Sequence, residues 1–239
     1  MRDLLVLWDI DYTLLNAGGV GRVVYDSVFR DMFGRDPVAL APMAGRTERA
    51  IIGDTLAMAG ITDPARHVDE FVAELARRAP DLRDMFGTRG HALPGAAAAL
   101  AAVAELGPGV VQSVLTGNVP AIAEAKLAAF GLDTYLDLDV GAYGDHHEVR
   151  AELVHLARSR ARAAYGRDFG GKATVLVGDT PLDVAAALAT GARAVGVATG
   201  GSTAADLAAA GAHAVLPDLA DTPAVVAAIA GPGGGVTSP

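Results

Sequence analysis

Two carboxylates stand one residue apart near the start of the chain. Asp9 and Asp11 directly follow the apolar run 4–8, which has the composition of a strand buried on both faces. Side chains at positions i and i+2 share a face of a strand, so the two acids would repel each other unless one is protonated or a cation lies between them. An Asp-rich turn that caps a helix is the alternative interpretation. The pair alone leaves both possibilities open.

A hydroxyl and two small polar residues follow a second apolar run. Thr116, Gly117 and Asn118 come directly after the run that ends at Leu115, and a helical pattern follows them. Such a turn presents backbone N–H groups to an anion. A simple helix cap made by the threonine or the asparagine explains the same residues equally well.

A third apolar run ends in a glycine and another acid. Gly178 and Asp179 follow it, and Thr180 and Asp183 have the spacing of a capping box at the start of a helix, with Pro181 in the first turn. The capping box accounts for Asp183. It does not account for Asp179, which remains a candidate functional acid.

Strands and helices that alternate along the chain position these three groups. The pattern predicts an α/β fold with a doubly wound parallel sheet, and sites in such folds lie beyond the carboxyl ends of the strands. The polar groups therefore meet at one edge of the sheet. The expected strands lie near residues 4–8, 110–115, 136–140, 173–177, 194–198 and 214–216, and the expected helices near 95–106, 121–130, 149–165 and 184–190.

A helical block interrupts this alternation after the first strand. Residues 20–33, 47–58 and 65–79 have helical spacing, and no convincing strand lies among them. We therefore expect a core formed by residues 1–16 and 90–239 and a small helical cap formed by residues 17–89. The Gly- and Pro-rich segment 231–239 is expected to be a flexible tail.

The acids that follow the three strands are typical ligands for a hard cation. Oxygen ligands at a crowded acidic site suit Mg²⁺, and magnesium beside an acidic nucleophile suits phosphoryl transfer. These acids are Asp9, Asp11, Asp179 and Asp183.

Composition narrows the possible partners. The formal net charge is −9, which disfavours nucleic acid and acidic lipid as partners, and the absence of cysteine excludes disulfides, thiolate zinc sites and cysteine nucleophiles. No uncharged apolar stretch is long enough for a membrane span, and the N-terminus does not resemble a signal peptide. We expect a soluble cytoplasmic protein that acts on a small phosphorylated metabolite, as a monomer or a homodimer.

Taken together, the motifs resemble those of the haloacid dehalogenase-like (HAD) superfamily of hydrolases. The first motif of that family, Asp-x-Asp-x-Thr, matches residues 9–13, the second matches Thr116, and the fourth, Gly-Asp-x-x-x-Asp, matches residues 178–183. The match is closest to the phosphoglycolate phosphatase-like branch, and an insertion after the first motif is the type 1 cap of the family.

The resemblance implies a Mg²⁺-dependent phosphatase that acts through an aspartyl-phosphate on a small phosphomonoester, phosphoglycolate-like or sugar-phosphate-like. Asp9 would be the nucleophile and Asp11 the general acid and then the general base. Thr116, with the amides around Gly117 and Asn118, would hold the phosphoryl oxygens. The metal would be held by Asp9, the carbonyl of Asp11, Asp179 and, directly or through the outer shell, Asp183.

The third motif of the family is usually a lysine, and two cations compete for its role. Arg150 stands at the matching position, at a predicted helix start, and its guanidinium suits carboxylate and phosphate. Lys126 lies in the preceding helix, in a register that predicts a solvated structural side chain. We therefore assign the role to Arg150.

Two further positions bear on specificity. Tyr12 stands beside the nucleophile, where the family most often has glycine; it either narrows the entrance, stacks on a substrate, or is a harmless variant. Arg46 and Thr47 precede a predicted cap helix and resemble the substrate-binding cap loop of phosphoglycolate phosphatase-like proteins. A plain helix cap beside a surface arginine is the alternative.

Two other functions fit the same motifs. A phosphoglucomutase-like phosphotransferase would need a basic residue in the cap, and lysine is absent from residues 14–90. A catalytically silent binding module is disfavoured because the motif acids Asp9, Asp11 and Asp179 are intact. The sequence does not name the substrate.

Overall fold

A five-stranded parallel sheet forms the centre of the molecule in the computed structural model, which describes residues 3–231. The order is β4-β1-β5-β6-β7, and every neighbouring pair is parallel. Trp8, the last residue of β1, pairs with Val114 of β4 and Val177 of β5, so these three strands end at the same edge. The strands are β1 (Leu4–Trp8), β4 (Val110–Val114), β5 (Thr174–Gly178), β6 (Arg193–Val197) and β7 (Ala214–Leu216).

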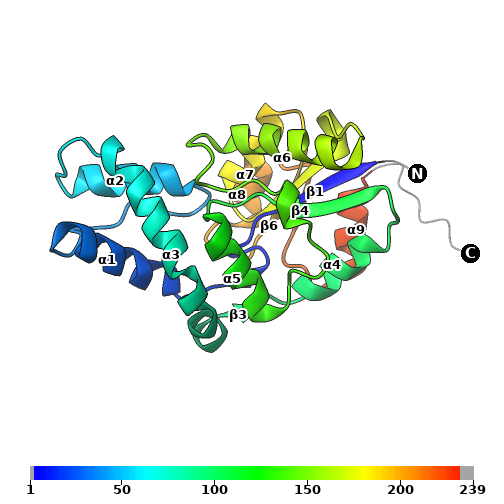
Figure 1. Cartoon of the computed structure of the whole chain (residues 1–239). Helices are drawn as coiled ribbons and strands as arrows, with labels where there is room; N and C mark the ends of the chain where they lie inside the picture. Colours follow the sequence, from blue (N-terminus) through cyan, green and yellow to red (C-terminus); the bar gives the residue numbers. More distant parts are fainter. Residues whose placement is uncertain (1–2, 232–239) are drawn as a thin grey trace, which may run out of the picture.

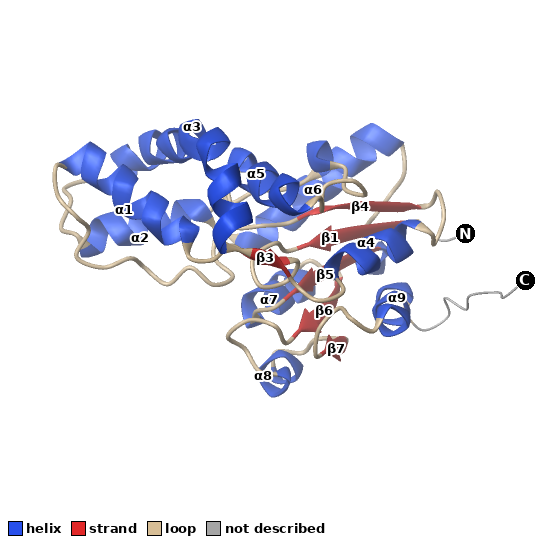
Figure 2. Cartoon of the chain, turned by 90° about the horizontal axis from the view of Figure 1, so that it is seen from below, coloured by secondary structure: helices blue, strands red, loops and turns tan. Residues whose placement is uncertain are grey.

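Helices cover both faces of this sheet (Figure 2). One face packs against α4 (Ala96–Ala104), α5 (Pro120–Phe130) and α9 (Thr222–Ala230). The other packs against α6 (Arg150–Tyr165), α7 (Pro181–Ala189) and α8 (Ala204–Ala209). Side chains of β1 alternate between the two apolar layers, which is why the whole strand is apolar and buried. The predicted α/β fold with a doubly wound parallel sheet is confirmed.

A separate group of helices lies beyond one end of the sheet (Figure 1). It consists of α1 (Val20–Phe33), α2 (Glu48–Met58) and α3 (Ala65–Arg89), and we call it the cap. Two short strands, β2 (Leu15–Asn16) and β3 (His91–Ala92), pair antiparallel where the chain leaves the core and returns to it. The apolar cluster of the cap is completed by Val119 and Ile122 at the start of α5.

The strand expected at residues 136–140 is wrong. A short 3-10 helix at Leu138–Val140 takes its place, begun by the Asp137 side chain, which accepts a hydrogen bond from the Asp139 amide. The chain bonds to the edge of β4 through Asp137, whose amide donates to the Gln112 carbonyl and whose carbonyl accepts from the Ser113 hydroxyl, and through an isolated bridge of Leu115 to Ala142. The segment, in which Leu and Asp alternate and Val140 is the buried residue, therefore lies against the edge of the sheet without joining it as a strand.

The third cap helix is longer than its sequence pattern predicts. It continues past Pro80 to Arg89, because Leu82 and Phe86 in its last turns are buried in the cap cluster. A second short 3-10 helix, Gly171–Ala173, leads into β5. The predicted flexible tail, residues 231–239, lies outside the described residues except for Gly231. Between residues 3 and 231, no helix has both the length and the apolarity that a membrane crossing requires.

Candidate active site

The ends of β1, β4 and β5 bring three motif residues to one edge of the sheet. Asp9 follows β1, Thr116 lies two residues beyond β4, and Asp179 directly follows β5. All three are buried, and the Asp9 amide donates to the carbonyl of Val177 at 2.8 Å. Parallel register thus brings Asp9 beside two residues that lie more than a hundred positions further along the sequence.

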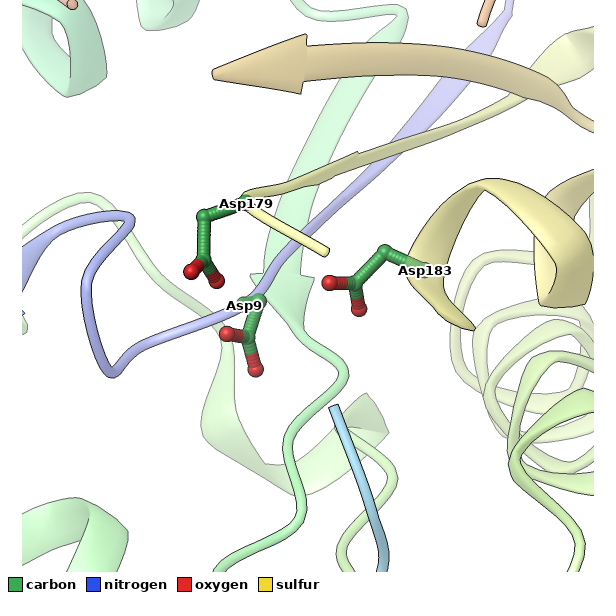
Figure 3. Close-up of side chains that lie close together, drawn as sticks. All are labelled: Asp9, Asp179 and Asp183. Atoms are coloured by element: carbon green, nitrogen blue, oxygen red, sulfur yellow. The ribbon is translucent and has the colours of Figure 1, made fainter. Parts of the chain in front are cut away.

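Three carboxylates converge at this edge (Figure 3). Asp9, Asp179 and Asp183 each offer an oxygen, and these oxygens lie within 4.8 Å of one another. Asp183 is held there by the capping box of α7: the Thr180 hydroxyl accepts from the Asp183 amide, and the Asp183 carboxylate accepts from the Thr180 amide. The predicted capping box therefore exists and also delivers its acid to the site.

Two glycines make room for these acids. A Cβ added at Gly178 would lie 2.3 Å from Cγ of Asp183, and one added at Gly200 would lie 1.8 Å from Oδ2 of Asp179. Any larger residue at either position would displace a carboxylate. The loop that contains Gly200 is a part of the site that the sequence interpretation did not include.

Arg150 is the cation of this acidic cluster. It is the first residue of α6, only 7% exposed, and its Nη2 donates to Asp9 Oδ1 at 2.8 Å. The same nitrogen lies 2.6 Å from Asp183 Oδ1, an ion pair that is not aligned as a hydrogen bond, and donates to the Leu115 carbonyl at 3.2 Å. The structure thus places the predicted third-motif residue directly on the predicted nucleophile.

Lys126 is not the solvated side chain that its register predicts. It is 4% exposed, and its Nζ lies 2.8 and 2.6 Å from the two carboxylate oxygens of Asp11 and 2.7 Å from Oδ1 of Asn118. The prediction fails because α5 is covered on both sides, by the sheet layer and by the cap; the ring of Phe86 lies 5.8 Å from the ammonium.

Asp11 does not share a strand face with Asp9. The strand ends at Trp8, so the i, i+2 rule does not apply, and the Asp11 carboxylate meets Lys126 and the Asn118 side-chain amide, the latter at 2.7 Å. The three clustered acids therefore do not include Asp11. Its assignment as a metal ligand through the backbone carbonyl stays a prediction.

The electrostatics of the site fit a divalent cation. Burial raises the pKa of the Asp9 carboxyl well above its ordinary value, Arg150 opposes this, and Asp183 and Asp179 add to it. Burial, followed by the charge of Asp183, raises the pKa of Asp179 to about 7. Four carboxylates face two cations, Arg150 and Lys126. A hard dication beside these oxygen donors would balance the charge, so the residues present suit Mg²⁺.

The predicted anion-binding turn has one amide that the protein itself does not use. The Thr116 amide donates to the Ala142 carbonyl, and the Asn118 amide donates to the Thr116 hydroxyl at 3.2 Å. The Gly117 amide forms no hydrogen bond with any residue between 3 and 231. It is therefore the amide of this turn that stays available for a phosphoryl oxygen.

These features have known counterparts. Residues 6–188 match the family model of haloacid dehalogenase-like hydrolases. The chain belongs to this family. No match is found among curated proteins.

Solved structures of HAD-like proteins share the whole fold. A candidate haloacid dehalogenase-like hydrolase from Bacteroides fragilis aligns with a TM-score of 0.65 at 20% identity, covering 92% of this chain and 99% of that one. A candidate β-phosphoglucomutase from Bacteroides vulgatus aligns with a TM-score of 0.62 at 16% identity, covering 94% of this chain and 91% of that one. A candidate phosphoglycolate phosphatase from Lactobacillus plantarum aligns with a TM-score of 0.61 at 15% identity, covering 94% of this chain and 99% of that one. These similarities show the fold.

Tyr12 occupies a backbone conformation that favours glycine, the residue that the family resemblance led us to expect there. Its φ is 58°, in the left-handed region, which costs a residue with a Cβ about 1–2 kcal/mol. The turn is held by its amide, which donates to Leu15, and by its carbonyl, which accepts from the Thr199 hydroxyl. The side chain is 46% exposed and lines the mouth of the cavity above the site.

Arg46 and Thr47, the predicted substrate-binding residues of the cap loop, are differently placed. Arg46 lines the cavity, but its Nη2 is 2.5 Å from Asp54 Oδ2. Thr47 occupies the N-cap position of α2, yet its hydroxyl donates to the Glu148 carbonyl at 2.9 Å and does not cap the helix. Thr47 is not among the residues that line the cavity, and its hydroxyl ties the cap to the core.

Sequence reasoning missed a buried acid in the cap. Glu48 begins α2, and its amide donates to the Gly117 carbonyl at 2.9 Å, which holds it over the anion-binding turn. Its carboxylate accepts a short hydrogen bond from the hydroxyl of Tyr25, another buried residue. Glu48 has the sequence signature of an ordinary first-turn acid, so no local pattern reveals its burial.

Glu48 should make the free energy of unfolding depend on pH. Burial raises its pKa from 4.5 to about 7, so between these values the folded chain holds a proton that the unfolded chain has lost, and stability falls as pH rises. Glu48→Gln cannot titrate. The free energy of unfolding of Glu48→Gln, relative to that of the wild type, should therefore increase from pH 5 to pH 7. The increase is about 3 kcal/mol over the whole interval between the two pKa values.

Urea denaturation of both proteins in EDTA across this range measures that difference. The other buried acids are common to both proteins and cancel. Stability curves that run parallel would show that Glu48 is ionised throughout.

Proposed function

We propose that this HAD-like hydrolase is a Mg²⁺-dependent phosphatase that cleaves a small phosphomonoester through an aspartyl-phosphate on Asp9. The observation that supports it most is the placement of Asp9. It lies buried at the end of β1, within reach of Arg150 and two further acids, and it lines a cavity of about 340 Å³ beneath the cap. The structural relatives named as a phosphatase and a phosphoglucomutase support phosphoryl transfer.

Arg150 orients the nucleophile. It donates to Asp9 Oδ1, and Oδ2 accepts no hydrogen bond from the described residues, so Oδ2 is the oxygen that attacks phosphorus. The P–O bond to the leaving alcohol breaks as the Asp9–phosphorus bond forms. The Gly117 amide and the guanidinium of Arg150 hold the phosphoryl oxygens as charge moves onto them.

Asp11 moves the protons. It gives a proton to the leaving oxygen in the first step and takes one from the attacking water in the second, which releases phosphate and frees Asp9. In its resting ion pair with Lys126 the Asp11 carboxylate carries no proton, so the pair has to open and Asp11 has to take up a proton from solvent before the first transfer. Lys126 and Asn118 set the resting position of the carboxylate. Mg²⁺ held by Asp9, Asp179, Asp183 and the Asp11 carbonyl would neutralise the phosphate and the clustered acids.

Removal of the metal should abolish phosphate release. We expect turnover of a phosphomonoester panel in Mg²⁺, none in EDTA, and recovery when Mg²⁺ is restored. Saturating Mg²⁺ should also raise Tm by several degrees, because a ligand at 100 times its Kd stabilises the folded state by about 2.7 kcal/mol.

A salt of equal ionic strength without a divalent cation is the control for the Tm shift. Full turnover in EDTA would remove the metal from the proposal. No turnover of any phosphomonoester in Mg²⁺ would favour a silent binding module. The cap contributes two arginines to the cavity lining, Arg46, which is held by Asp54, and Arg22, so the phosphotransferase stays the alternative to the phosphatase.

A further inference from the structure

The cavity above Asp9 has a polar floor and an apolar wall. The core supplies the motif acids and cations, whereas the cap and the start of α5 supply buried hydrocarbon side chains. These wall residues are Val24, Ile51, Leu75, Leu82, Phe86 and Ile122. With a volume of about 340 Å³, the cavity has room for a compact carbon skeleton beside a phosphoryl group.

Among the buried residues of this wall, one pair is polar; the cap arginines Arg22 and Arg46 also line the cavity but are not buried. Tyr25 and Glu48 both line the cavity, both are buried, and the tyrosine hydroxyl donates to Oε1 of Glu48. Oε2 accepts no hydrogen bond from any residue between 3 and 231. The Glu48 amide is anchored on the Gly117 carbonyl, so the position of the acid relative to the phosphate-binding turn is fixed. Oε2 is not among the fully enclosed unpartnered atoms, and when Glu48 is ionised this oxygen can accept a hydrogen bond from a donor on the substrate.

This wall disfavours two of the substrate types that the family resemblance suggests. A carboxylate such as that of phosphoglycolate would face Glu48. Of the two cap arginines that line the cavity, Arg46 is engaged with Asp54, and Arg22 lies exposed on α1 with Asp26 at 3.8 Å. A sugar phosphate would bury several hydroxyls against hydrocarbon. Each hydroxyl left without a partner there weakens binding, because its hydrogen bonds to water are lost and not replaced.

We propose, on the basis of the phosphatase function above, that the preferred substrate is the phosphomonoester of a compact, mainly apolar alcohol that carries one hydrogen-bond donor for Glu48. The donor is a hydroxyl or an ammonium group at the end of the skeleton away from phosphorus. The apolar wall binds the skeleton, and Glu48 with Tyr25 reads the donor.

A panel of four-carbon esters that differ only in their polar groups tests this proposal. It contains 4-hydroxybutyl, 4-aminobutyl and butyl phosphate, 4-phosphonooxybutanoate and erythritol 4-phosphate, with three- and five-carbon homologues of the first two. In Mg²⁺, kcat/KM for the best donor-bearing ester should exceed that for 4-phosphonooxybutanoate and for erythritol 4-phosphate by about tenfold or more. An ammonium ester that outperforms its hydroxyl counterpart assigns the donor as a cation; the reverse assigns it as an alcohol.

Variants of the polar pair provide a readout that a purely structural role would not change. Glu48→Leu should remove the preference, lowering the kcat/KM ratio of the best donor-bearing ester to butyl phosphate by about tenfold, and Tyr25→Phe should lower it less. Glu70→Gln, on the exposed surface of α3, is the control and should leave the ratio unchanged.

The outcomes separate the two proposals. If 4-phosphonooxybutanoate or erythritol 4-phosphate is hydrolysed in preference to the donor-bearing esters, this inference is wrong and the phosphatase function stands. A ratio unchanged by Glu48→Leu also overturns it. No phosphate release from any ester overturns the phosphatase function, and the inference with it.

Discussion

Replacing Asp9 with asparagine should lower kcat for phosphate release by about 10⁴-fold or more, because an amide oxygen cannot form the aspartyl-phosphate. The fold should survive the change. Asparagine has nearly the shape of aspartate, its Oδ1 can still accept from Arg150, and one charge leaves a cluster in which Asp179 and Asp183 repel it. Steady-state release in Mg²⁺ and rapid-quench mass analysis for a phosphorylated Asp9 in the wild type measure the effect.

A matched control separates chemistry from folding. Asp133→Asn makes the same substitution at an exposed position after α5, and its kcat and Tm should equal those of the wild type. If Asp9→Asn turned over within tenfold of the wild type, Asp9 would not be the nucleophile.

Replacing Arg150 with methionine should be the most destabilising single change in the site. It leaves Asp9 and Asp183 buried without their cation, and breaking a buried ion pair by removing one partner costs about 3–5 kcal/mol. Loss of the group that orients Asp9 should also lower kcat by about 10²–10³-fold. Urea denaturation in EDTA and steady-state kinetics in Mg²⁺ measure the two effects independently.

Two further variants sharpen this prediction. Arg150→Lys keeps the charge without the planar fork, so it should recover part of both losses. Arg162→Met, on an exposed position of α6, should change the free energy of unfolding by less than about 0.5 kcal/mol. An Arg150→Met protein as stable as the wild type would mean that the acids are neutral in the absence of the guanidinium.

The fold could be predicted from the sequence because its signals are local. Buried parallel strands are uniformly apolar, helices have their own periodicity, and glycines such as Gly131 and Gly166 stand at the helix ends. The segment 136–140 was mispredicted because its alternating Leu and Asp residues are typical of a half-buried strand, and this pattern is the same whether or not the segment pairs with the sheet. Its outcome depends on the turn that Asp137 forms, which apolar patterning does not report.

The site could be predicted only where a residue follows a strand. Asp9, Thr116 and Asp179 are marked by the strands before them, and Arg150 by its motif position. Lys126 and Glu48 lie on helices with the pattern of surface residues, and they become buried only when the cap packs against α5. No spacing along the chain encodes that contact, so both were missed.

The shared packing of α3 and α5 has a consequence for how specificity changes in evolution. The apolar cluster of the cap is closed by Val119 and Ile122 of the core, and Phe130 lies at the border of both clusters. Unfolding the cap would strip cover from α5, so the two parts lose structure in one cooperative transition. A cap bound in this way is not an exchangeable module. New substrates are reached by point substitutions in the wall of the cavity, each of which also alters the stability of the whole chain.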